Sequence, residues 1–161
     1  MKLGIDVSTY FEMQQHKAKY LVNGKEVQPL DLFRHNGVDI MRIRLWVDPK
    51  SPEGEPYLAG NCDLDNFIKL AKLAKSKGYS IMLDFHYSDF WCDPGKQCVP
   101  KSWAHLDLNG LVEKVYSYTK DTLATIAAEG IKLSYIQVGN RGQDDRMERT
   151  QTYVTEAACH T

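Results

Sequence analysis

Residues 63–86, DLDNFIKLAKLAKSKGYSIMLDFH, combine a helix signal and a strand signal in one unit. Apolar side chains recur at spacings of three and four between positions 64 and 74, which is typical of the buried face of a helix. Asp63 is a suitable N-cap and Gly78 a suitable residue just beyond the end. The apolar segment 79–86 has the length of a strand. The stretch therefore predicts a helix followed directly by a strand, the repeating unit of α/β folds.

The same alternation extends along most of the chain. The predicted strands are 3–7, 40–47, 79–86 and 131–138, and the predicted helices are 29–37, 63–78 and a long one from Asn109 or Gly110 to Gly130. Strands that alternate with helices predict parallel strands joined by helical crossovers. Two α/β architectures fit this order: an open doubly wound sheet, or a barrel of eight β/α units.

Polar side chains gather at the carboxyl ends of all four predicted strands, where no glycine-rich phosphate loop is found. They are Asp6, Arg42, Arg44, Asp84, His86 and Asn140. In a β/α barrel the active site is built at this end of the strands. A complete barrel needs about 250 residues, so four strands predict the first half of a (β/α)8 TIM-type barrel.

Composition narrows the functional classes. The 161 residues are 43% hydrophobic and 25% charged, with a net charge of −1, as in one globular domain. The balanced charge argues against nucleic acid or an anionic membrane as a partner. The apolar runs fall far short of the roughly 18 residues that span a membrane.

Cysteine usage and the start of the sequence bear on localisation. Four cysteines are too few and too scattered for a disulfide scaffold. Cys92 and Cys98 lie in one loop and could pair if oxidised, but with no export signal free thiols are expected there. The first strand begins almost at Met1, with no signal peptide before it. We therefore expect a cytoplasmic protein, or a secreted one if an upstream signal peptide has been lost.

The chain changes character after Asn140. Residues 1–140 contain 14 Lys and 3 Arg, whereas residues 141–161 contain 3 Arg and no Lys, Leu, Ile, Phe or Trp. This predicts one domain over 1–140 and a polar, disordered tail over 141–161 that is foreign to it. Two explanations stay open, a polar extension and a reading-frame shift.

Several motifs together resemble glycoside hydrolase family 53, the endo-β-1,4-galactanases or arabinogalactan endo-β-1,4-galactosidases. The most specific is LDFHYSDFWCDPGKQ at 83–97, close to the family pattern D-F-H-Y-S-D-x-W-x-D-P-x-x-Q. The resemblance also includes GIDVS at 4–8, GVDIMRIRLWVDP at 37–49, PKSW at 100–103, VYSYTKD at 115–121 and QVGN at 137–140. It implies a retaining hydrolase of β-1,4-galactosidic bonds in (arabino)galactan, the side chains of pectin.

The resemblance also implies that both catalytic carboxylates are missing from the sequence as given. In the family, strand four ends in Asn-Glu and that Glu is the acid/base, but here Arg141 follows Asn140. The nucleophile is a Glu at the end of strand seven, which has no counterpart here. Arginine stays protonated near neutral pH and can serve neither role. A one-base shift at an AGA or CGA codon for Arg141 would create a Glu codon, GAG, with the first base of the next codon.

The remaining motif residues predict a supporting and sugar-binding site. The resemblance implies that Arg42 helps to keep the nucleophile ionised and that Asn140 bonds the sugar 2-hydroxyl, with His86 as a further supporting residue. Candidate substrate contacts are Asp84, Tyr87, Ser88, Trp46 and Trp91, with Trp103 as another possible stacking ring. The structural alternatives are a salt bridge for Arg42, core packing for the aromatic rings and a plain turn for Asn140. Asp84 and His86 share a strand face, but further Zn²⁺ ligands are not evident, so neither metal nor cofactor is expected.

Three functional hypotheses follow. The first is a galactanase by descent that is inactive as this chain. The second is a non-catalytic fragment that binds galactan or self-associates through its open barrel edges. The third is an unrelated open α/β binding protein, which the motif series disfavours.

Overall fold

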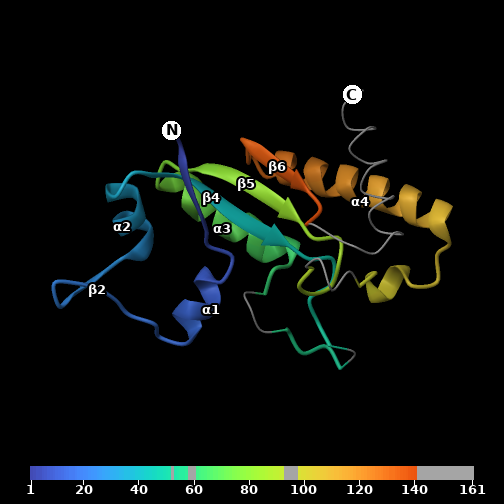
Figure 1. Cartoon of the computed structure of the whole chain (residues 1–161), viewed down its shortest axis with the longest axis horizontal. Coiled ribbons are helices and arrows are strands. Elements are labelled where there is room, and N and C mark those ends of the chain that lie inside the picture. Colours follow the sequence, from blue (N-terminus) through green and yellow to red (C-terminus); the bar gives the residue numbers. More distant parts are fainter. Residues whose placement is uncertain (52, 58–60, 93–97, 141–161) are drawn as a thin grey trace.

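Four parallel strands form the sheet on which the rest of the chain is arranged (Figure 1). The computed structural model describes residues 1–51, 53–57, 61–92 and 98–140. The strands, in sheet order, are β1 (Leu3–Asp6), β4 (Val38–Leu45), β5 (Ser80–Phe85) and β6 (Tyr135–Val138). Every neighbouring pair is parallel. The predicted α/β fold of four parallel strands with helical crossovers is confirmed.

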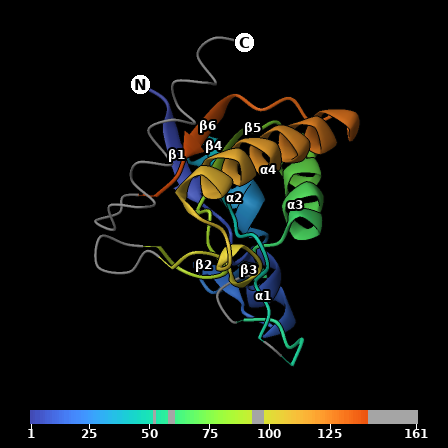
Figure 2. The ribbon, with the colours of Figure 1, turned by 90° about the vertical axis from the view of Figure 1, so that its right-hand side faces the viewer.

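The crossover helices are α2 (Pro29–His35), α3 (Leu64–Ser76) and α4 (Leu108–Ala128). Figure 2 shows α3 and α4 on the same side of the sheet. The predicted cap of α3 is confirmed, because an Asp63 carboxylate oxygen accepts the N–H of Asn66 at 2.8 Å. In the described part of the chain, no helix has the length and apolar character needed to span a membrane.

Several element boundaries differ from the sequence prediction: β4 lies two residues earlier than the predicted 40–47, and the starts of α4 and β6 also differ. Helix α4 begins before Asn109, because the carboxylate of Asp107 caps it by accepting the N–H of Gly110 at 2.8 Å. Strand β6 begins at Tyr135 rather than at Ile131, because the N–H of Ile131 bonds back to the carbonyl of Ile126 and so still belongs to the helix end. A short 3-10 helix, η1 (Lys101–Trp103), precedes α4.

A segment between β1 and α2 was not predicted. It consists of the helix α1 (Tyr10–Gln15) and an antiparallel hairpin of β2 (Tyr20–Val22) and β3 (Lys25–Val27). The two turn residues have positive φ angles, 50° at Asn23 and 77° at Gly24. Asn-Gly between two short extended segments is a strong hairpin signal, since both residues tolerate the left-handed backbone that this turn requires.

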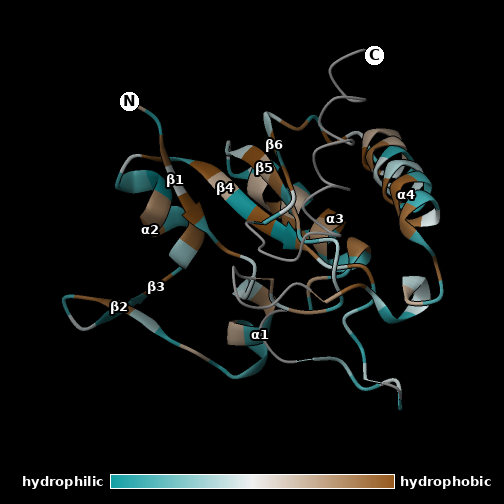
Figure 3. Cartoon of the chain, turned by 45° about the vertical axis from the view of Figure 1, so that its right-hand side comes forward, coloured by the Kyte–Doolittle hydropathy of each residue, from teal (hydrophilic) through white to brown (hydrophobic). Residues whose placement is uncertain are grey.

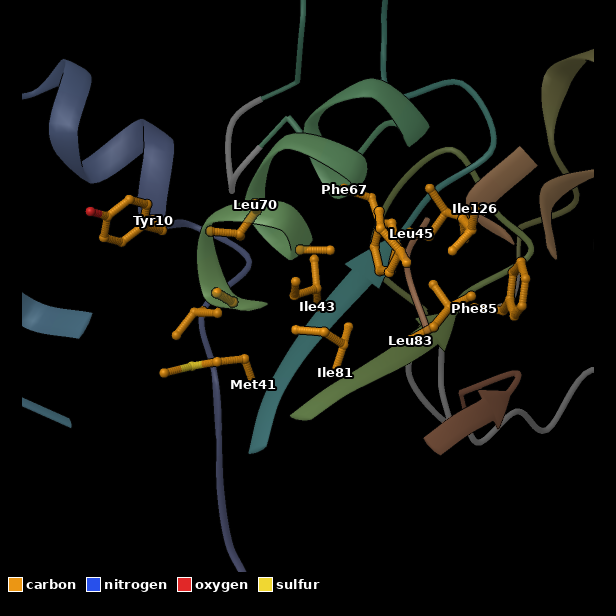
Figure 4. Packing of buried hydrophobic residues seen from close by; sticks show 14 of the residues in the cluster. Tyr10, Met41, Ile43, Leu45, Phe67, Leu70, Ile81, Leu83, Phe85 and Ile126 are labelled. Carbon is orange, nitrogen blue, oxygen red and sulfur yellow. The ribbon is translucent and has the colours of Figure 1, made fainter. Parts of the chain in front are cut away.

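The hydrophobic core lies between the sheet and its helices (Figure 4). Alternate residues of the two central strands face α3 and are almost fully buried, which is expected for a strand whose side chains alternate between two faces. These core residues are Met41, Ile43 and Leu45 of β4, Ile81, Leu83 and Phe85 of β5, and Phe67 and Leu70 of α3. The intervening residues of β4 and β5 therefore lie on the opposite face of the sheet, away from α3.

The opposite face of the sheet is polar. Figure 3 shows hydrophilic residues along β4 between hydrophobic ones. The register places Asp6 beside Arg42, and it aligns Arg44, Asp84 and Gln137 across three strands. Within the described residues β1 and β6 each pair along one side only, and both edges leave hydrophobic side chains exposed: Leu3, Tyr135 and Ile136.

Candidate functional site

Arg42 is the centre of an ion-pair network on the polar face of the sheet. Its Nη1 donates to Asp6 Oδ2 at 2.5 Å, and its Nη2 is ion-paired with Asp84 Oδ2. The register explains both contacts, because Asp6 is the partner of Arg42 on β1 and Asp84 lies two residues beyond the Arg42 partner on β5. Asp84 is fully buried, whereas the Arg42 side chain keeps 28% of its surface exposed. The salt bridge expected as the structural alternative for Arg42 is present.

His86 continues this network to the end of β5. Its Nδ1 accepts the indole N–H of Trp46 at 3.2 Å and faces the backbone N–H of Cys92 at 3.4 Å. Because Nδ1 receives donors, the ring proton lies on Nε2, which then donates to Asp84 Oδ2 at 3.0 Å. His86 is therefore held in one tautomer and orients Asp84.

Arg44 and Trp91 stack on each other beside this network. The Arg44 guanidinium carbon lies 3.8 Å from the centroid of the Trp91 ring and 5.8 Å from that of Trp46. Trp46 is buried, since Phe90 and Trp91 cover its ring at centroid distances of 5.2 and 5.8 Å. Trp91 is 39% exposed. Of the four rings predicted as stacking platforms, Trp46, Tyr87, Trp91 and Trp103, only Trp91 offers an accessible surface.

Asn140 and Ser88 both lie at the carboxyl ends of the strands, which we call the polar edge: Asn140 follows β6 and Ser88 follows β5. The Asn140 amide donates through Nδ2 to the carbonyl of Cys92 at 2.7 Å, which fixes the orientation of the side chain after β6. Ser88 is buried, and its carbonyl accepts the N–H of Val47 at 2.9 Å. Asn140 is half-buried, so its amide lies within the polar edge rather than on an open turn.

Tyr87 lies away from the site. Its ring stacks on Phe85 at a centroid distance of 5.2 Å, and its hydroxyl bonds the Thr119 hydroxyl at 2.8 Å on α4. This environment is the helix-facing core, so the structure does not bring Tyr87 together with the other predicted sugar contacts. Trp103 is buried too, with its ring edge-on to Tyr118 at 5.4 Å.

Burial controls the acidity of several core groups. Desolvation raises the pKa of the Tyr87 phenol to about 12, with the Thr119 hydrogen bond acting in the opposite direction. Desolvation likewise raises the pKa of the Cys62 thiol to about 12. Because a thiolate is the reactive form of cysteine, Cys62 is not a nucleophile near neutral pH.

Sequence reasoning missed Asp89, which lies after β5 and links its own loop to the backbone after β4 and to the backbone at η1. Its Oδ1 accepts the N–H of Asp48 at 3.0 Å, and its Oδ2 accepts the N–H of Lys101 at 2.8 Å. The signal was its place inside the 83–97 motif. Beside it lies an open pocket of about 300 Å³ whose lining includes Tyr57, Phe90 and Trp91. Aromatic walls of this kind suit the apolar faces of sugar rings.

The carboxylates of the polar face are both engaged. Asp6 accepts the N–H of Ser8 at 3.0 Å through Oδ1 and the Arg42 guanidinium through Oδ2. Asp84 is buried and bound through Oδ2 to Arg42 and His86. Across the described residues, no three His, Cys, Asp or Glu side chains are grouped as metal ligands. Arg141, predicted to replace an acid/base Glu, lies outside the described residues.

Comparison with known sequences gives a consistent result. Residues 2–157 match the family described as Glycosyl hydrolase family 53. An endo-β-1,4-galactanase of Bacillus subtilis is 38% identical over 138 residues, which is 85% of this chain and 32% of that protein. An arabinogalactan endo-β-1,4-galactanase of Cellvibrio japonicus is 38% identical over 153 residues, 94% of this chain and 39% of that protein.

Solved structures agree with the sequence comparison. The Ignisphaera aggregans GH53 catalytic domain superimposes with a TM-score of 0.86 at 35% identity, covering 98% of this chain and 48% of that one. One from a study of two fungal β-1,4-galactanases gives a TM-score of 0.82 at 29% identity and likewise covers 48% of its chain. The chain thus spans about a third of the curated relatives and about half of the solved domains. The match reaches residue 157, and the foreign tail over 141–161 stays a prediction.

Proposed function

Because this chain belongs to glycosyl hydrolase family 53, we propose that it forms the galactan-binding part of a retaining endo-β-1,4-galactanase site. Support comes from relatives that are named as galactanases and are 38% identical. The observation that carries the proposal is the polar edge of the sheet, where an accessible indole, Trp91, stands next to the network of Arg42, Asp84 and His86. Carbohydrate sites combine these two features, a stacking ring and fixed polar groups.

Each residue of this edge has a proposed role. Trp91 stacks against a galactose ring through its accessible surface. Asn140 presents its amide to a sugar hydroxyl, held in place by the Cys92 carbonyl. Arg42 and His86 support the site from beneath, through their shared contact with Asp84.

We also propose that the 161-residue chain does not cleave galactan by itself. Retaining hydrolysis needs two carboxyl groups about 5 Å apart, one to attack the anomeric carbon and one to protonate the leaving oxygen. Asp84 is fully buried, and Asp6 is ion-paired with Arg42, so the two do not form a pair of free carboxyl groups. Arg141 follows Asn140 in place of a Glu.

Two assays on the purified chain test this proposal. Calorimetric titration with β-1,4-galactotetraose measures binding, and a reducing-sugar assay on galactan measures cleavage. We expect measurable binding, no release of reducing ends, and weaker but still measurable binding in Trp91→Ala. The matched control is Tyr116→Ala, because Tyr116 is an equally exposed aromatic residue on α4 and lies outside the polar edge.

The outcomes separate the hypotheses. A folded chain that binds no tetraose would refute the galactan-binding proposal, and release of reducing ends would refute the argument from the missing carboxylates. Equal binding to a β-1,4-glucan oligosaccharide of the same length would contradict a galactan-specific site.

Self-association through the sheet edges is a second proposal, supported by the exposed hydrophobic side chains on β1 and β6. Leu3 lies on one edge, and Tyr135 and Ile136 lie on the other. Unpaired strand edges with apolar side chains favour pairing with another chain. Light scattering during size-exclusion chromatography should show species larger than 18.4 kDa, and Ile136→Lys should shift them toward the monomer. A strictly monomeric chain would contradict this proposal.

A further inference from the structure

Trp91 lies on a loop, yet its ring is held firmly on one side. The loop follows β5 and contributes no regular secondary structure at this position. The Arg44 guanidinium covers one face of the indole at 3.8 Å from the ring centroid. Trp46 and His86 contact the ring edge-on, at centroid distances of 5.8 and 6.1 Å. Trp91 nevertheless keeps 39% of its surface exposed, and it lines the aromatic pocket together with Tyr57.

Arg44 is itself anchored rigidly. It lies in the middle of the sheet on β4, and its backbone N–H donates to the Ser8 hydroxyl at 2.9 Å. Only 3% of its side chain is exposed. A side chain with this anchoring can define the position of a loop residue that stacks on it.

The guanidinium of Arg44 stacks on the Trp91 indole and makes a long ion pair with Asp6. Its Nε lies 3.7 Å from Asp6 Oδ2, beyond hydrogen-bond distance, and both Nε and Nη1 are buried without a hydrogen-bond partner. Arg42, by contrast, uses its guanidinium for the two carboxylates. The two arginines of β4 thus make different contacts: Arg42 pairs with two carboxylates, and Arg44 stacks on the Trp91 ring.

We propose that Arg44 is a positioning residue: its guanidinium holds one face of the Trp91 indole and so fixes the other face as the ring on which a galactose residue stacks. This inference rests on the proposed galactan binding for its ligand, but the Arg44–Trp91 contact can be tested without one. Arg44 contacts the indole from beneath and does not touch the sugar. Its loss therefore weakens binding only through Trp91.

A measurement of fluorescence quenching by acrylamide tests the contact itself. The chain has three tryptophans, and Trp46 and Trp103 are buried, so quenching reports mainly on Trp91. Arg44→Met should increase the quenching constant, because the covered indole face becomes accessible. Arg44→Lys, which keeps the charge but not the flat guanidinium, should give an intermediate value. Unchanged quenching in both variants would overturn the proposal.

A double-mutant cycle in the calorimetric titration with galactotetraose tests the positioning role. A partly exposed cation–π contact corresponds to roughly a tenfold change in affinity, and Trp91 is partly exposed, so Arg44→Met should weaken binding about tenfold in the native background. In the Trp91→Ala background the same substitution should change any residual binding little. An equal loss in both backgrounds would overturn the proposal, since it would mean that Arg44 acts independently of Trp91.

Two further results keep the outcomes distinct. If the native chain binds no tetraose while quenching still rises in Arg44→Met, the proposed function fails and the positioning contact stands. Far-UV circular dichroism checks that each variant is folded. If Arg44→Met does not fold, Arg44→Lys together with Trp91→Ala completes the cycle.

Discussion

Replacing Arg42 by methionine is expected to destabilise the fold by about 3 kcal/mol, because it leaves a buried carboxylate without its cation. Asp84 is fully buried and is ion-paired with Arg42 through Oδ2. Breaking a buried ion pair by removing one partner costs about 3–5 kcal/mol. We place the cost at the lower end for two reasons: 28% of the Arg42 side chain is exposed to solvent, and His86 still donates to Asp84.

Urea unfolding followed by circular dichroism measures this change. With a slope of about 2 kcal/mol per molar urea, a loss of about 3 kcal/mol lowers the midpoint by about 1.5 M. The control is Lys77→Met, which removes the exposed ion pair between Lys77 and Asp31 at 2.6 Å. An exposed pair contributes below about 1 kcal/mol, so the control should move the midpoint by less than about 0.5 M.

The same experiment can refute the reasoning. If Arg42→Met shifts the midpoint no further than Lys77→Met, the buried charge of Asp84 is not held by Arg42. The double variant Arg42→Met with Asp84→Asn should recover part of the loss, because the unpaired charge is then absent. A double variant less stable than Arg42→Met alone would also contradict the argument.

Four further predictions concern the core and its surroundings. Asp63→Ala removes the cap of α3 and should cost about 1 kcal/mol in thermal unfolding. Leu83→Ala should cost about 2–5 kcal/mol in urea, since Leu83 is fully buried between sheet and helices. The raised pKa of Tyr87, about 12, means that the folded chain holds this proton more tightly than the unfolded chain. The protonated phenol therefore contributes to stability below about pH 10, and this contribution is lost as pH rises to about 12. In Tyr87→Phe, urea titrations at alkaline pH should no longer show this pH-dependent loss. Cys62, whose pKa burial raises to about 12, should react with a thiol reagent more slowly than the exposed Cys98 in the folded chain.

The elements that sequence predicted well are those with local determinants. The helix over 64–76 follows from apolar spacing and the Asp63 cap, both of which can be recognised within a few residues. The start of α4 was misplaced because Asp107 and Asn109 offer competing caps, and only the contact with Gly110 selects Asp107. The hairpin around Asn23 was missed although its turn signal is local, because its strands are only three residues long.

Strand alternation predicts which face of the sheet each candidate side chain occupies, and this part of the site could be predicted from the sequence. Period-two alternation places Arg42 and Arg44 on one face of β4, and the structure has them there. The same rule places Tyr87 with Phe85 on the helix face, and the structure agrees with the alternation rather than with the predicted sugar contact. The burial of Trp46 could not be predicted in this way, because it results from rings of the loop after β5 that cover the indole. Which loop covers which strand end is not encoded in a local pattern.

Sugar binding and bond cleavage have separate requirements at this edge of the sheet. The proposed binding groups, Trp91 and Asn140, are held by contacts inside the described strands and loops, namely the Arg44 guanidinium and the Cys92 carbonyl. Cleavage needs two carboxyl groups that are free to reach the substrate. Releasing Asp84 by the Arg42 substitution would not supply one, because burial and the His86 contact keep it beneath the surface. Arg42→Met should therefore lower stability without producing hydrolysis of galactan in the reducing-sugar assay.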